Sequence, residues 1–542
     1  MKRVPVILLI FSLFAPLATA GEEARGQEFV VNILPSPSNL NPQRISTTNE
    51  AQIALALFEG LLTYHPSTLG PMPGVARKWE WNKDYTRITF YLRENARFSD
   101  GTPITAAHFR ESWLYLIAHN LPYASLLDVI TGARALREGK GSPEEVGIVA
   151  KDPHTLVLTL TNPAPYILKF LPHTAFAPVA SGMDLSRTWA PSRDLVGNGP
   201  YRILKVEKDR LVLEKNPQYW DQESVKIPRL VITSYDDPER VMRLFNGDAI
   251  HWVADGYDLS LLNNRKALVL NPLFATTFYF FNASTPPFDD PRVRRALALL
   301  VPWDELRSSD RYFFPTSHLV PQIPGYPEVA GITEPDEETA LSLLQEAGFP
   351  EGKGLPVITC YAVEGGQEEI DILTRLWRER LGLQVQVKAF TSMQAYFNAM
   401  EKAPSFHLAS ITWVGDFPDP LTFLSLWESG GSLNYARFSS PEYDELLREA
   451  NTTQGKERYS LLARAEEFLI SESAVILPIA HSPALNLVDL DWIGGWYPNP
   501  LDIHPFHTLE FLPTELGPGV VRSEERGGIP QRLLFLTRSR KE

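Results

Sequence analysis

Cysteine is almost absent from this sequence, since Cys360 is the only one in 542 residues. An internal disulfide is therefore impossible, and stability must come from a hydrophobic core. Hydrophobic residues make up 44% of the chain, which over this length is enough for two or more domains. Cys360 lies in the apolar stretch PVITCYAV, where a buried free thiol is the ordinary interpretation.

Motifs of catalysis and of metal binding are also missing. Two GKG tripeptides, at 139–141 and 352–354, lack the spacing and the following Ser or Thr of a phosphate-binding loop. No G-x-S-x-G nucleophile motif occurs. His504 and His507 have a metal-like gap, but Pro505 between them prevents a shared helical face, and no cysteine or carboxylate cluster lies beside them. We therefore predict no enzyme activity, no metal and no cofactor.

No apolar run at the N-terminus is long enough for a membrane span. Lys2 and Arg3 precede an apolar stretch at 4–17, which is shorter than the about 20 residues that cross a bilayer. The small residues at 18–20 (ATA) complete a signal-peptide pattern, so we predict cleavage after Ala20. No cysteine follows that site, which excludes a bacterial lipoprotein. We expect a soluble protein in the periplasm, where an outer membrane would retain it.

An excess of positive charge is lacking as well. The net charge is −14, and removal of Lys2 and Arg3 with the signal peptide would make it −16. A chain this acidic does not suit the phosphate backbone of nucleic acid. We therefore predict that nucleic acid is not a partner.

Helix and strand patterns alternate along the chain without a fixed repeat. RITFYLRE, TLVLTLTN, RLVLEKN and PRLVITSY are rich in β-branched and aromatic residues and predict strands. Helical periodicity occurs in NEAQIALALFEGLL, DPRVRRALALL, EETALSLLQEAG and EEIDILTRLWRERLG. Asp290-Pro291 predicts a helix start and Gly348 a helix end. The alternation indicates mixed α/β domains, and residues 514–542 have the character of a weakly ordered tail.

The segment 410–447 is unusual because it combines aromatic residues, acids and three prolines in predicted loops. From local chemistry alone, its Asp416 would be a turn or helix-cap residue. A family resemblance gives Asp416 a different interpretation.

From about residue 30 to residue 512 the sequence resembles the periplasmic oligopeptide-binding proteins of ABC transporters, in the large peptide and nickel class of solute-binding proteins. No single motif is decisive, but the ordered set is specific. In chain order the motifs are LNP (40–42), LFEGLLTY, GVARKWEW, ITFYLRENARFSDGTPITAAHF, LPYASLL, VGNGPYRIL, PPFDDPRVRRAL, LLQEAGFP, WRERLGLQVQV, WVGDFPDPLTFL, SPEYDELL and WIGGWYPNPLDI.

The resemblance implies an α/β fold of the periplasmic-binding-protein type, with two hinged lobes and three domains. The expected boundaries are domain I at 21–57, 181–275 and 483–513, domain II at 58–180, and domain III at 276–482. The chain would then cross between the lobes more than once.

The resemblance also implies a peptide site between the lobes. Asp416 matches the aspartate that forms a salt bridge with the ligand ammonium. The other matching residues are Thr412, Trp413 and Val414 on a strand that pairs with the ligand backbone, Ser46, Thr47 and Thr48 on the opposite wall, Tyr123 packing over the ligand, and His481 and Ser482 where family members carry a tyrosine.

Some matching positions depart from the family. Ser410 and Gly366 stand where well-known members hold the ligand C-terminus with positive or histidine side chains, so ligand length is left open. The implied function is capture of short peptides for an ABC permease with cytoplasmic ATPases, by a monomer. Two alternatives remain open: another small solute on the same fold, such as chelated nickel, a cell-wall peptide or a sugar, or a peptide-sensing or chaperone-like protein.

Overall fold

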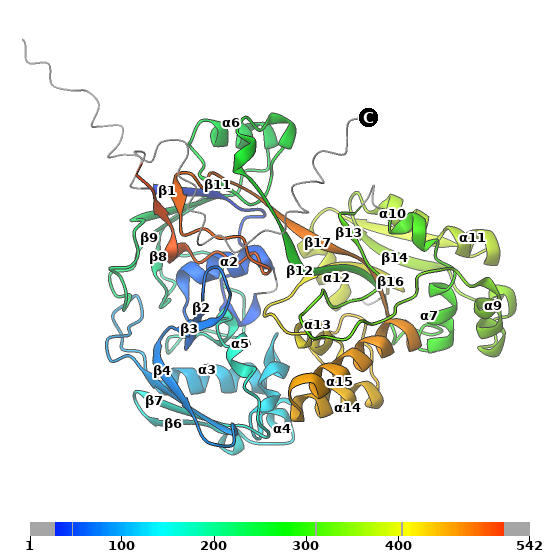
Figure 1. Ribbon diagram of the computed structural model, residues 1–542, viewed down its shortest axis with the longest axis horizontal. Coiled ribbons are helices and arrows are strands. Elements are labelled where there is room, and N and C mark those ends of the chain that lie inside the picture. The colour runs from blue at the N-terminus through cyan, green and yellow to red at the C-terminus, as the bar shows by residue number, and fades with distance from the viewer. Residues whose placement is uncertain (1–27, 46, 309–311, 403–404, 514–542) are drawn as a thin grey trace, which may run out of the picture.

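The computed structural model describes residues 28–45, 47–308, 312–402 and 405–513. The predicted signal peptide, Ser46 and the predicted tail lie outside the described residues. Figure 1 shows two bodies side by side, joined in the middle by long strands. We call the body that contains β1 to β11 the first lobe and the body that contains β14 to β16 the second lobe.

One mixed sheet extends through both lobes. Its eleven strands follow the order β15-β14-β16-β12-β17-β11-β1-β10-β9-β8, with β13 paired to β17. The bounds are β1 (Glu28–Asn32), β8 (Tyr201–Glu207), β9 (Arg210–Lys215), β10 (Arg229–Thr233), β11 (Trp252–Val253), β12 (Leu268–Phe281), β13 (Phe314–Pro315), β14 (Ile358–Val363), β15 (Val385–Phe390), β16 (Leu408–Val414) and β17 (Ile476–Val488).

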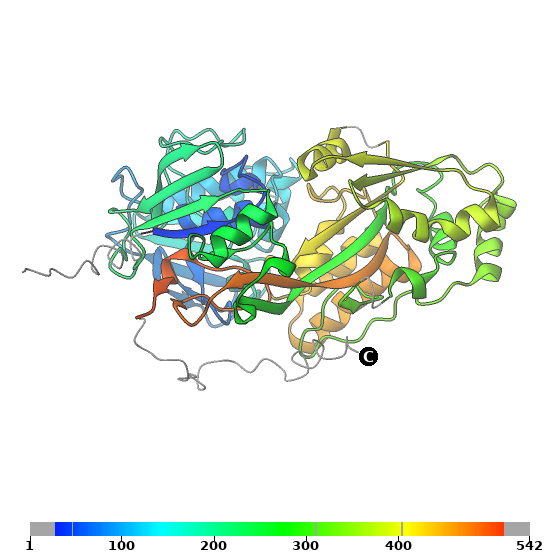
Figure 2. The same ribbon diagram turned by 90° about the horizontal axis from the view of Figure 1, so that it is seen from above.

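The two longest strands, β12 and β17, connect the lobes. They pair antiparallel and run together from one lobe to the other (Figure 2). The chain therefore crosses between the lobes twice, as the resemblance implies. The expected domain boundaries at 275/276 and 482/483 fall inside these strands. The division into three domains stays a prediction.

The first lobe also contains a separate four-stranded antiparallel sheet. Its order is β4-β5-β7-β6, formed by β4 (Ala76–Trp81), β5 (Arg87–Leu92), β6 (Ile148–Asp152) and β7 (Thr155–Thr159). Ile88, Phe90 and Leu92 alternate with more exposed residues and are buried, as a half-buried strand requires. The strand prediction for RITFYLRE is confirmed.

Helix α7 (Pro291–Ala298) begins where the sequence predicts it. The Asp290 side chain accepts a hydrogen bond from the Arg292 N–H, and Pro291 occupies the first turn. The remaining helices that the site uses are α2 (Thr48–Leu57), α3 (Ala106–Ala118), α4 (Ala133–Arg137), α5 (Ile167–Phe170), α12 (Met393–Lys402), α13 (Leu421–Leu424), α14 (Pro441–Thr452) and α15 (Gly455–Glu467).

Two helical patterns differ from the structure. The pattern NEAQIALALFEGLL continues to Leu62, but α2 ends at Leu57, whose carbonyl accepts bonds from the Asn198 and Gly199 amides. The pattern EEIDILTRLWRERLG is divided at Thr374 into α10 (Gln367–Leu373) and α11 (Arg375–Leu381). In the first case the Leu57 carbonyl is bonded by a distant segment, and not by the N–H group one turn further along, as a continued helix would require.

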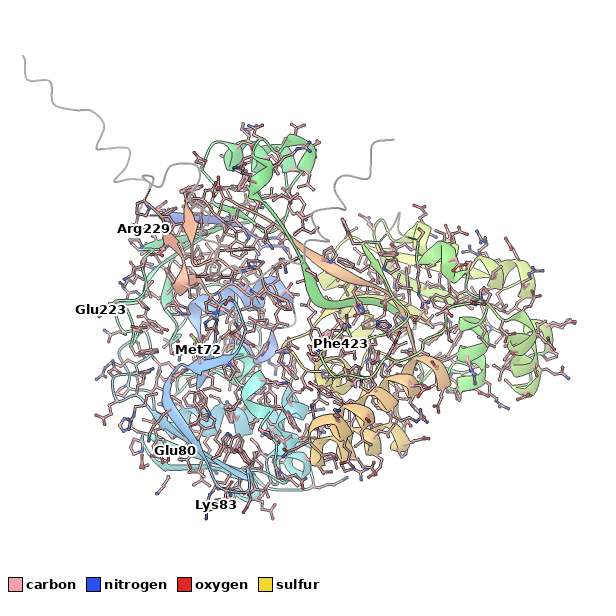
Figure 3. All side chains as sticks on the ribbon, in the orientation of Figure 1. Met72, Glu80, Lys83, Glu223, Arg229 and Phe423 are labelled. Carbon is pink, nitrogen blue, oxygen red and sulfur yellow. The ribbon has the colours of Figure 1, made fainter. Side chains whose placement is uncertain are left out.

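Buried apolar side chains continue from one lobe into the other. A single cluster includes Trp113 and Phe170 of the first lobe with Phe423 and Trp427 of the second. Phe423 lies near the middle of the molecule in Figure 3 and packs edge-on against Phe274 at 5.0 Å. The lobes are therefore in contact, and the structure is a closed form.

Cys360 is buried in β14, as expected, and burial raises the pKa of its thiol to about 12. Such a thiol is not reactive at neutral pH. Among the described residues no helix has the length and apolar character to cross a membrane.

Candidate functional site

Asp416 lies just after β16, where the two lobes meet. Gly415 precedes it, and a Cβ there would approach the Phe274 ring to 2.5 Å, so only glycine allows this packing. The Asp416 N–H donates to Thr422 Oγ1 at 2.9 Å, which fixes the turn into α13. The side chain of Asp416 is 16% exposed. The carboxylate is thus held at the lobe interface with little access to water.

Three residues of the first lobe contact Asp416. The Tyr123 hydroxyl donates to Oδ1 at 3.3 Å, and the Tyr64 hydroxyl donates to the main-chain oxygen at 3.2 Å. His173 Nε2 lies 3.6 Å from Oδ1. His173 Nδ1 accepts from the Ala175 N–H at 3.2 Å, so the ring proton is on Nε2 and faces the carboxylate. Sequence reasoning identified Tyr123 but missed Tyr64 and His173.

These contacts do not neutralise the charge of Asp416. Burial lowers the pKa of His173 to about 4, so its ring is uncharged at neutral pH. No lysine or arginine in the described part of the chain forms an ion pair with Asp416. Burial accordingly raises the pKa of the Asp416 carboxyl to about 7, with the Tyr123 and Thr422 hydrogen bonds opposing the rise.

The raised pKa has a direct consequence for the closed form. In water an aspartate has a pKa of about 3.9. Above pH 7 the ionised Asp416 therefore opposes closure without a ligand, and this penalty shrinks as the pH falls below 7. A cationic ligand group beside the carboxylate would remove the penalty at all of these pH values, because it favours the ionised form.

A small pocket adjoins the carboxylate. Both lobes contribute its walls, which include Tyr123, Ser125, Leu126, Trp413, Asp416, Phe417 and Leu433. The indole N–H of Trp413 is buried and has no hydrogen-bond partner among the described residues. The arrangement offers a negative charge, a polar N–H and apolar walls to a small ligand that carries a positive group.

The strand that leads to Asp416 has one open edge. β16 pairs along its length with β12, from Phe281–Leu408 to Ala275–Val414. On the other edge β14 contacts it only at Leu408. Beyond that residue the described residues place no strand on this edge. Thr412 and Val414, which the sequence predicts as ligand-pairing residues, lie on this segment.

A row of hydroxyl groups crosses the sheet beside this segment. Thr277 Oγ1 lies 2.7 Å from Thr412 Oγ1 and 3.3 Å from Ser482 Oγ. His481 points to the other face, where Nδ1 lies 2.9 Å from the buried Thr276 Oγ1 and the ring lies 5.3 Å from His318. Burial lowers the pKa of His481 to about 4. Of the predicted pair, Ser482 therefore shares a face with Thr412, and His481 does not.

The wall predicted to lie opposite β16, at residues 46–48, does not form a regular strand where the structure describes it. Thr47 has extended backbone angles (φ −120°, ψ 146°) and caps α2, its side chain accepting from the Glu50 N–H at 3.3 Å. Thr48 is the first residue of α2 and is exposed. Pairing of this wall with a ligand stays a prediction.

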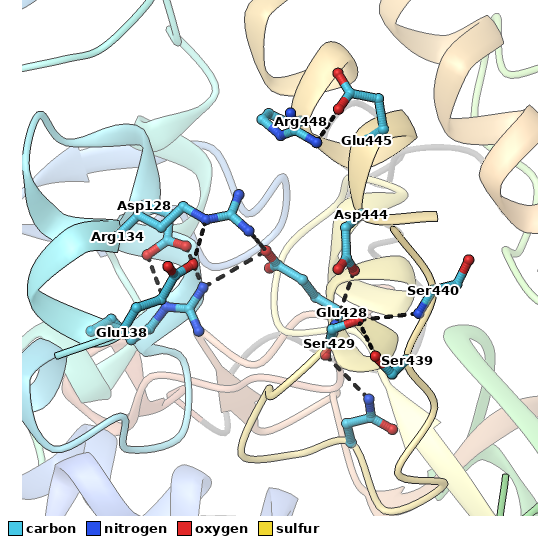
Figure 4. A network of polar contacts seen from close by, with 12 residues as sticks. Asp128, Arg134, Glu138, Glu428, Ser429, Ser439, Ser440, Asp444, Glu445 and Arg448 are labelled. Atoms are coloured by element: carbon cyan, nitrogen blue, oxygen red, sulfur yellow. Dashed lines mark hydrogen bonds and ion pairs between the residues drawn. The ribbon is translucent and has the colours of Figure 1, made fainter. Parts of the chain in front are cut away.

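Ion pairs join the lobes at another part of the interface (Figure 4). Glu428 of the second lobe lies 3.3 Å from Arg134 and 3.7 Å from Arg137 of the first lobe. Arg137 is nearly buried and binds Asp128 with two nitrogens. Burial raises the pKa of Glu428 to about 7, and the two arginines oppose that rise.

A second set of charges crosses the interface at Asp419. Its carboxylate accepts from Arg458 at 2.8 and 2.9 Å within the second lobe, and Lys169 of the first lobe lies 3.4 Å away. Because the partners that meet across the interface are far apart in sequence, no local pattern could have revealed these contacts.

His504, one of the two histidines spaced like metal ligands, contacts neighbouring side chains. His504 Nε2 lies 3.0 Å from Asp502 Oδ1, and its ring stacks on Trp496 at 4.0 Å. The described residues contain no group of three or more His, Cys, Asp or Glu that could hold a metal ion.

A two-lobed fold that closes over a charged interlobe pocket is typical of solute-binding proteins. Residues 70–435, more than half of the chain, match the family described as bacterial extracellular solute-binding proteins, family 5. The protein belongs to this family.

Several relatives and solved structures are similar to this chain over most of its length. The periplasmic oligopeptide-binding protein of Salmonella typhimurium is 31% identical, with 91% of this chain and 95% of the relative aligned. The structure of the Escherichia coli murein tripeptide-binding protein has a TM-score of 0.78 at 28% identity, covering 90% of this chain and 99% of that one. The Haemophilus influenzae oligopeptide-binding protein in complex with the peptide RPPGFSPFR has a TM-score of 0.78 at 25% identity, with 90% and 99% covered.

The comparisons also bear on lobe closure. The unliganded open form of a periplasmic murein tripeptide-binding protein has a TM-score of only 0.61, although its identity is 29% and its coverage is 90% of this chain and 97% of that one. Since sequence identity and coverage barely differ from those of the E. coli structure, the lower score reflects a different lobe arrangement. This agrees with the closed form that the interlobe contacts define.

Proposed function

We propose that the protein captures short peptides in the periplasm by binding their α-ammonium group to Asp416 inside the closed cleft. The observation that carries this proposal is a nearly buried carboxylate whose contacts from the first lobe are one tyrosine hydroxyl, that of Tyr123, and one neutral histidine, His173. A buried carboxylate without a cationic partner is costly unless a ligand supplies the charge. Every unmodified peptide has such a group at its N-terminus.

The open edge of β16 supplies the second part of the recognition. Thr412 and Val414 would pair with the ligand backbone as an added strand, which gives affinity that does not depend on the ligand side chains. The names of two relatives described above support this ligand class, since they give oligopeptides and a murein tripeptide as the ligands of those proteins.

A membrane partner could then recognise the closed, ligand-bound form of the protein. Arg134 and Arg137 reach Glu428 only when the lobes meet, so the closed surface differs from the open one. The expected partner is an ABC permease with cytoplasmic ATPases, and the binding protein acts as a monomer. Export through a signal peptide cleaved after Ala20 would bring the binding protein to the periplasm, where it can reach the permease in the inner membrane.

The alternative with a specific observation behind it is a cell-wall peptide. The E. coli structure with a TM-score of 0.78 is named for a murein tripeptide. That ligand class also carries an ammonium group, so Asp416 does not separate it from ordinary peptides. Discrimination between a cell-wall peptide and an ordinary peptide would depend on the ligand groups that follow its first residue.

Thermal unfolding with and without ligand tests the proposal. Tripeptides with free N-termini should raise the melting temperature, and their N-acetylated counterparts should not, because acetylation removes the charge. Equal shifts for both forms, or no shift with any free peptide, would contradict the proposal.

A further inference from the structure

A tyrosine hydroxyl closes part of the edge that the ligand would use. Tyr396 of α12 is 1% exposed and packs among Phe390 and Phe397. Its hydroxyl donates to the Ser410 carbonyl at 2.7 Å and accepts from the Ser410 N–H at 2.9 Å. Both backbone groups of Ser410 are therefore already bonded, at the position where β14 no longer accompanies β16.

The remaining residues of this edge follow from strand geometry. Successive residues of a strand direct their N–H and C=O groups to opposite edges. The Gly415 N–H donates to Phe274 of β12, so odd-numbered residues face β12. Ser410 and Asp416 face away from β12, toward Tyr396 and Thr422 respectively.

Two residues are left between these occupied positions. Thr412 and Val414 face the same edge as Ser410, and no described residue bonds their N–H or C=O groups there. We call this segment of β16 the pairing window. It offers four backbone hydrogen-bonding groups, and it is bounded by Tyr396 at one end and by Asp416 at the other.

A ligand whose ammonium lies at Asp416 must run antiparallel to β16. Its first residue would then lie opposite Val414 and its third opposite Thr412, each in position to exchange two hydrogen bonds. Its fifth residue would lie opposite Ser410, whose groups Tyr396 already occupies. Three consecutive ligand residues therefore fill the pairing window.

We infer that Tyr396 sets the length of ligand backbone that the protein binds, with a tripeptide completing the pairing. This inference rests on the proposed function and adds to it a residue that determines specificity. Longer peptides still bind, but their fourth and later residues leave the sheet edge and gain no further backbone hydrogen bonds.

Calorimetry with a series of alanine peptides tests the inference. The peptides have two to six residues, free N-termini and carboxamide C-termini, so that only the number of backbone groups changes. For the unaltered protein, affinity should rise about two- to twelvefold from the dipeptide to the tripeptide, which adds one hydrogen bond to Thr412, and then stay constant within about twofold. In Tyr396→Phe the Ser410 groups are released, so the pentapeptide should bind about fivefold or more tightly than the tripeptide.

Tyr361→Phe is the matched control. Tyr361 lies in the same aromatic cluster, 5.0 Å from Phe390, and its hydroxyl contacts Ser405 at 2.9 Å and not β16. Its length profile should match that of the unaltered protein. An affinity that keeps rising to the pentapeptide without any substitution, or an unchanged profile in Tyr396→Phe, would overturn the inference alone. No binding of any free peptide would overturn the proposed function and this inference with it.

Amide hydrogen exchange on the unaltered protein gives a check that needs no variant. Without ligand, the Ser410 amide should exchange slowly, and the Thr412 and Val414 amides should exchange fast. The tripeptide should slow exchange at Thr412 and Val414 and leave Ser410 unchanged. Fast exchange at Ser410 without ligand would contradict the role of Tyr396.

Discussion

Replacing Asp416 by Asn removes the charge and keeps the size of the side chain. The Tyr123 hydroxyl at 3.3 Å can still donate to the Asn oxygen, so the turn and the lobe contact should persist. A bound ammonium would then be desolvated without a counter-charge, which costs about 3–5 kcal/mol. Peptide affinity should therefore fall by roughly two to three orders of magnitude or more.

Calorimetric titration with a free and an N-acetylated tripeptide measures this effect. The unaltered protein should bind the free peptide far more tightly, and in Asp416→Asn the difference between the two peptides should largely disappear. Equal affinities in all four combinations would refute amine recognition and would favour a solute of another kind.

Glu466→Gln is the control for loss of a buried carboxylate. Glu466 accepts from the Leu319 and Val320 amides and from the Tyr326 hydroxyl inside the second lobe. Burial raises the pKa of Glu466 to about 7, as it does for Asp416. Glu466→Gln should lower the melting temperature and leave the affinity of the folded protein for the free tripeptide unchanged.

Four further outcomes are expected. The distance between fluorophores on the two lobes measures closure without ligand. Closure should become about tenfold more favourable from pH 8 to pH 6, because burial raises the pKa of the Asp416 carboxyl to about 7, and Asp416→Asn should lose this dependence. Closure that does not depend on pH would contradict the raised pKa of Asp416. Glu428→Gln should weaken peptide binding about fivefold and barely change the melting temperature without ligand, whereas Glu445→Gln, which removes an exposed pair within α14, should change neither. Truncation after residue 516 should leave peptide affinity within about threefold, or less than roughly 0.7 kcal/mol, and a larger loss would show that the tail docks on a lobe. The intact mass of protein from a periplasmic extract should correspond to cleavage after Ala20, and a membrane-bound form that retains residues 1–20 would contradict export as a soluble protein.

Local signals in the sequence predict local structure well in this protein. Asp290 and Pro291 define the start of α7 through one side-chain hydrogen bond and one fixed backbone angle, both of which the sequence contains. The end of α2 could not be predicted in this way, because the Leu57 carbonyl is bonded by residues 198 and 199, far along the chain.

The site divides in the same manner. Asp416 and Tyr123 are predicted as site residues only through the family resemblance, since they are 293 positions apart and neither stands out locally. His173 and the Arg134–Glu428 pair follow no motif and become visible only when the lobes are brought together. Tyr396 was missed because its role depends on where β14 diverges from β16, which no sequence pattern specifies.

A crystal structure of the protein with a bound tripeptide would show directly whether Asp416 binds the ligand ammonium. We expect the ligand amino nitrogen about 3 Å from the Asp416 carboxylate, with the ligand backbone antiparallel to β16 and bonded to Val414 and Thr412. A ligand that leaves Asp416 without a cationic partner, or that runs parallel to β16, would contradict this expectation.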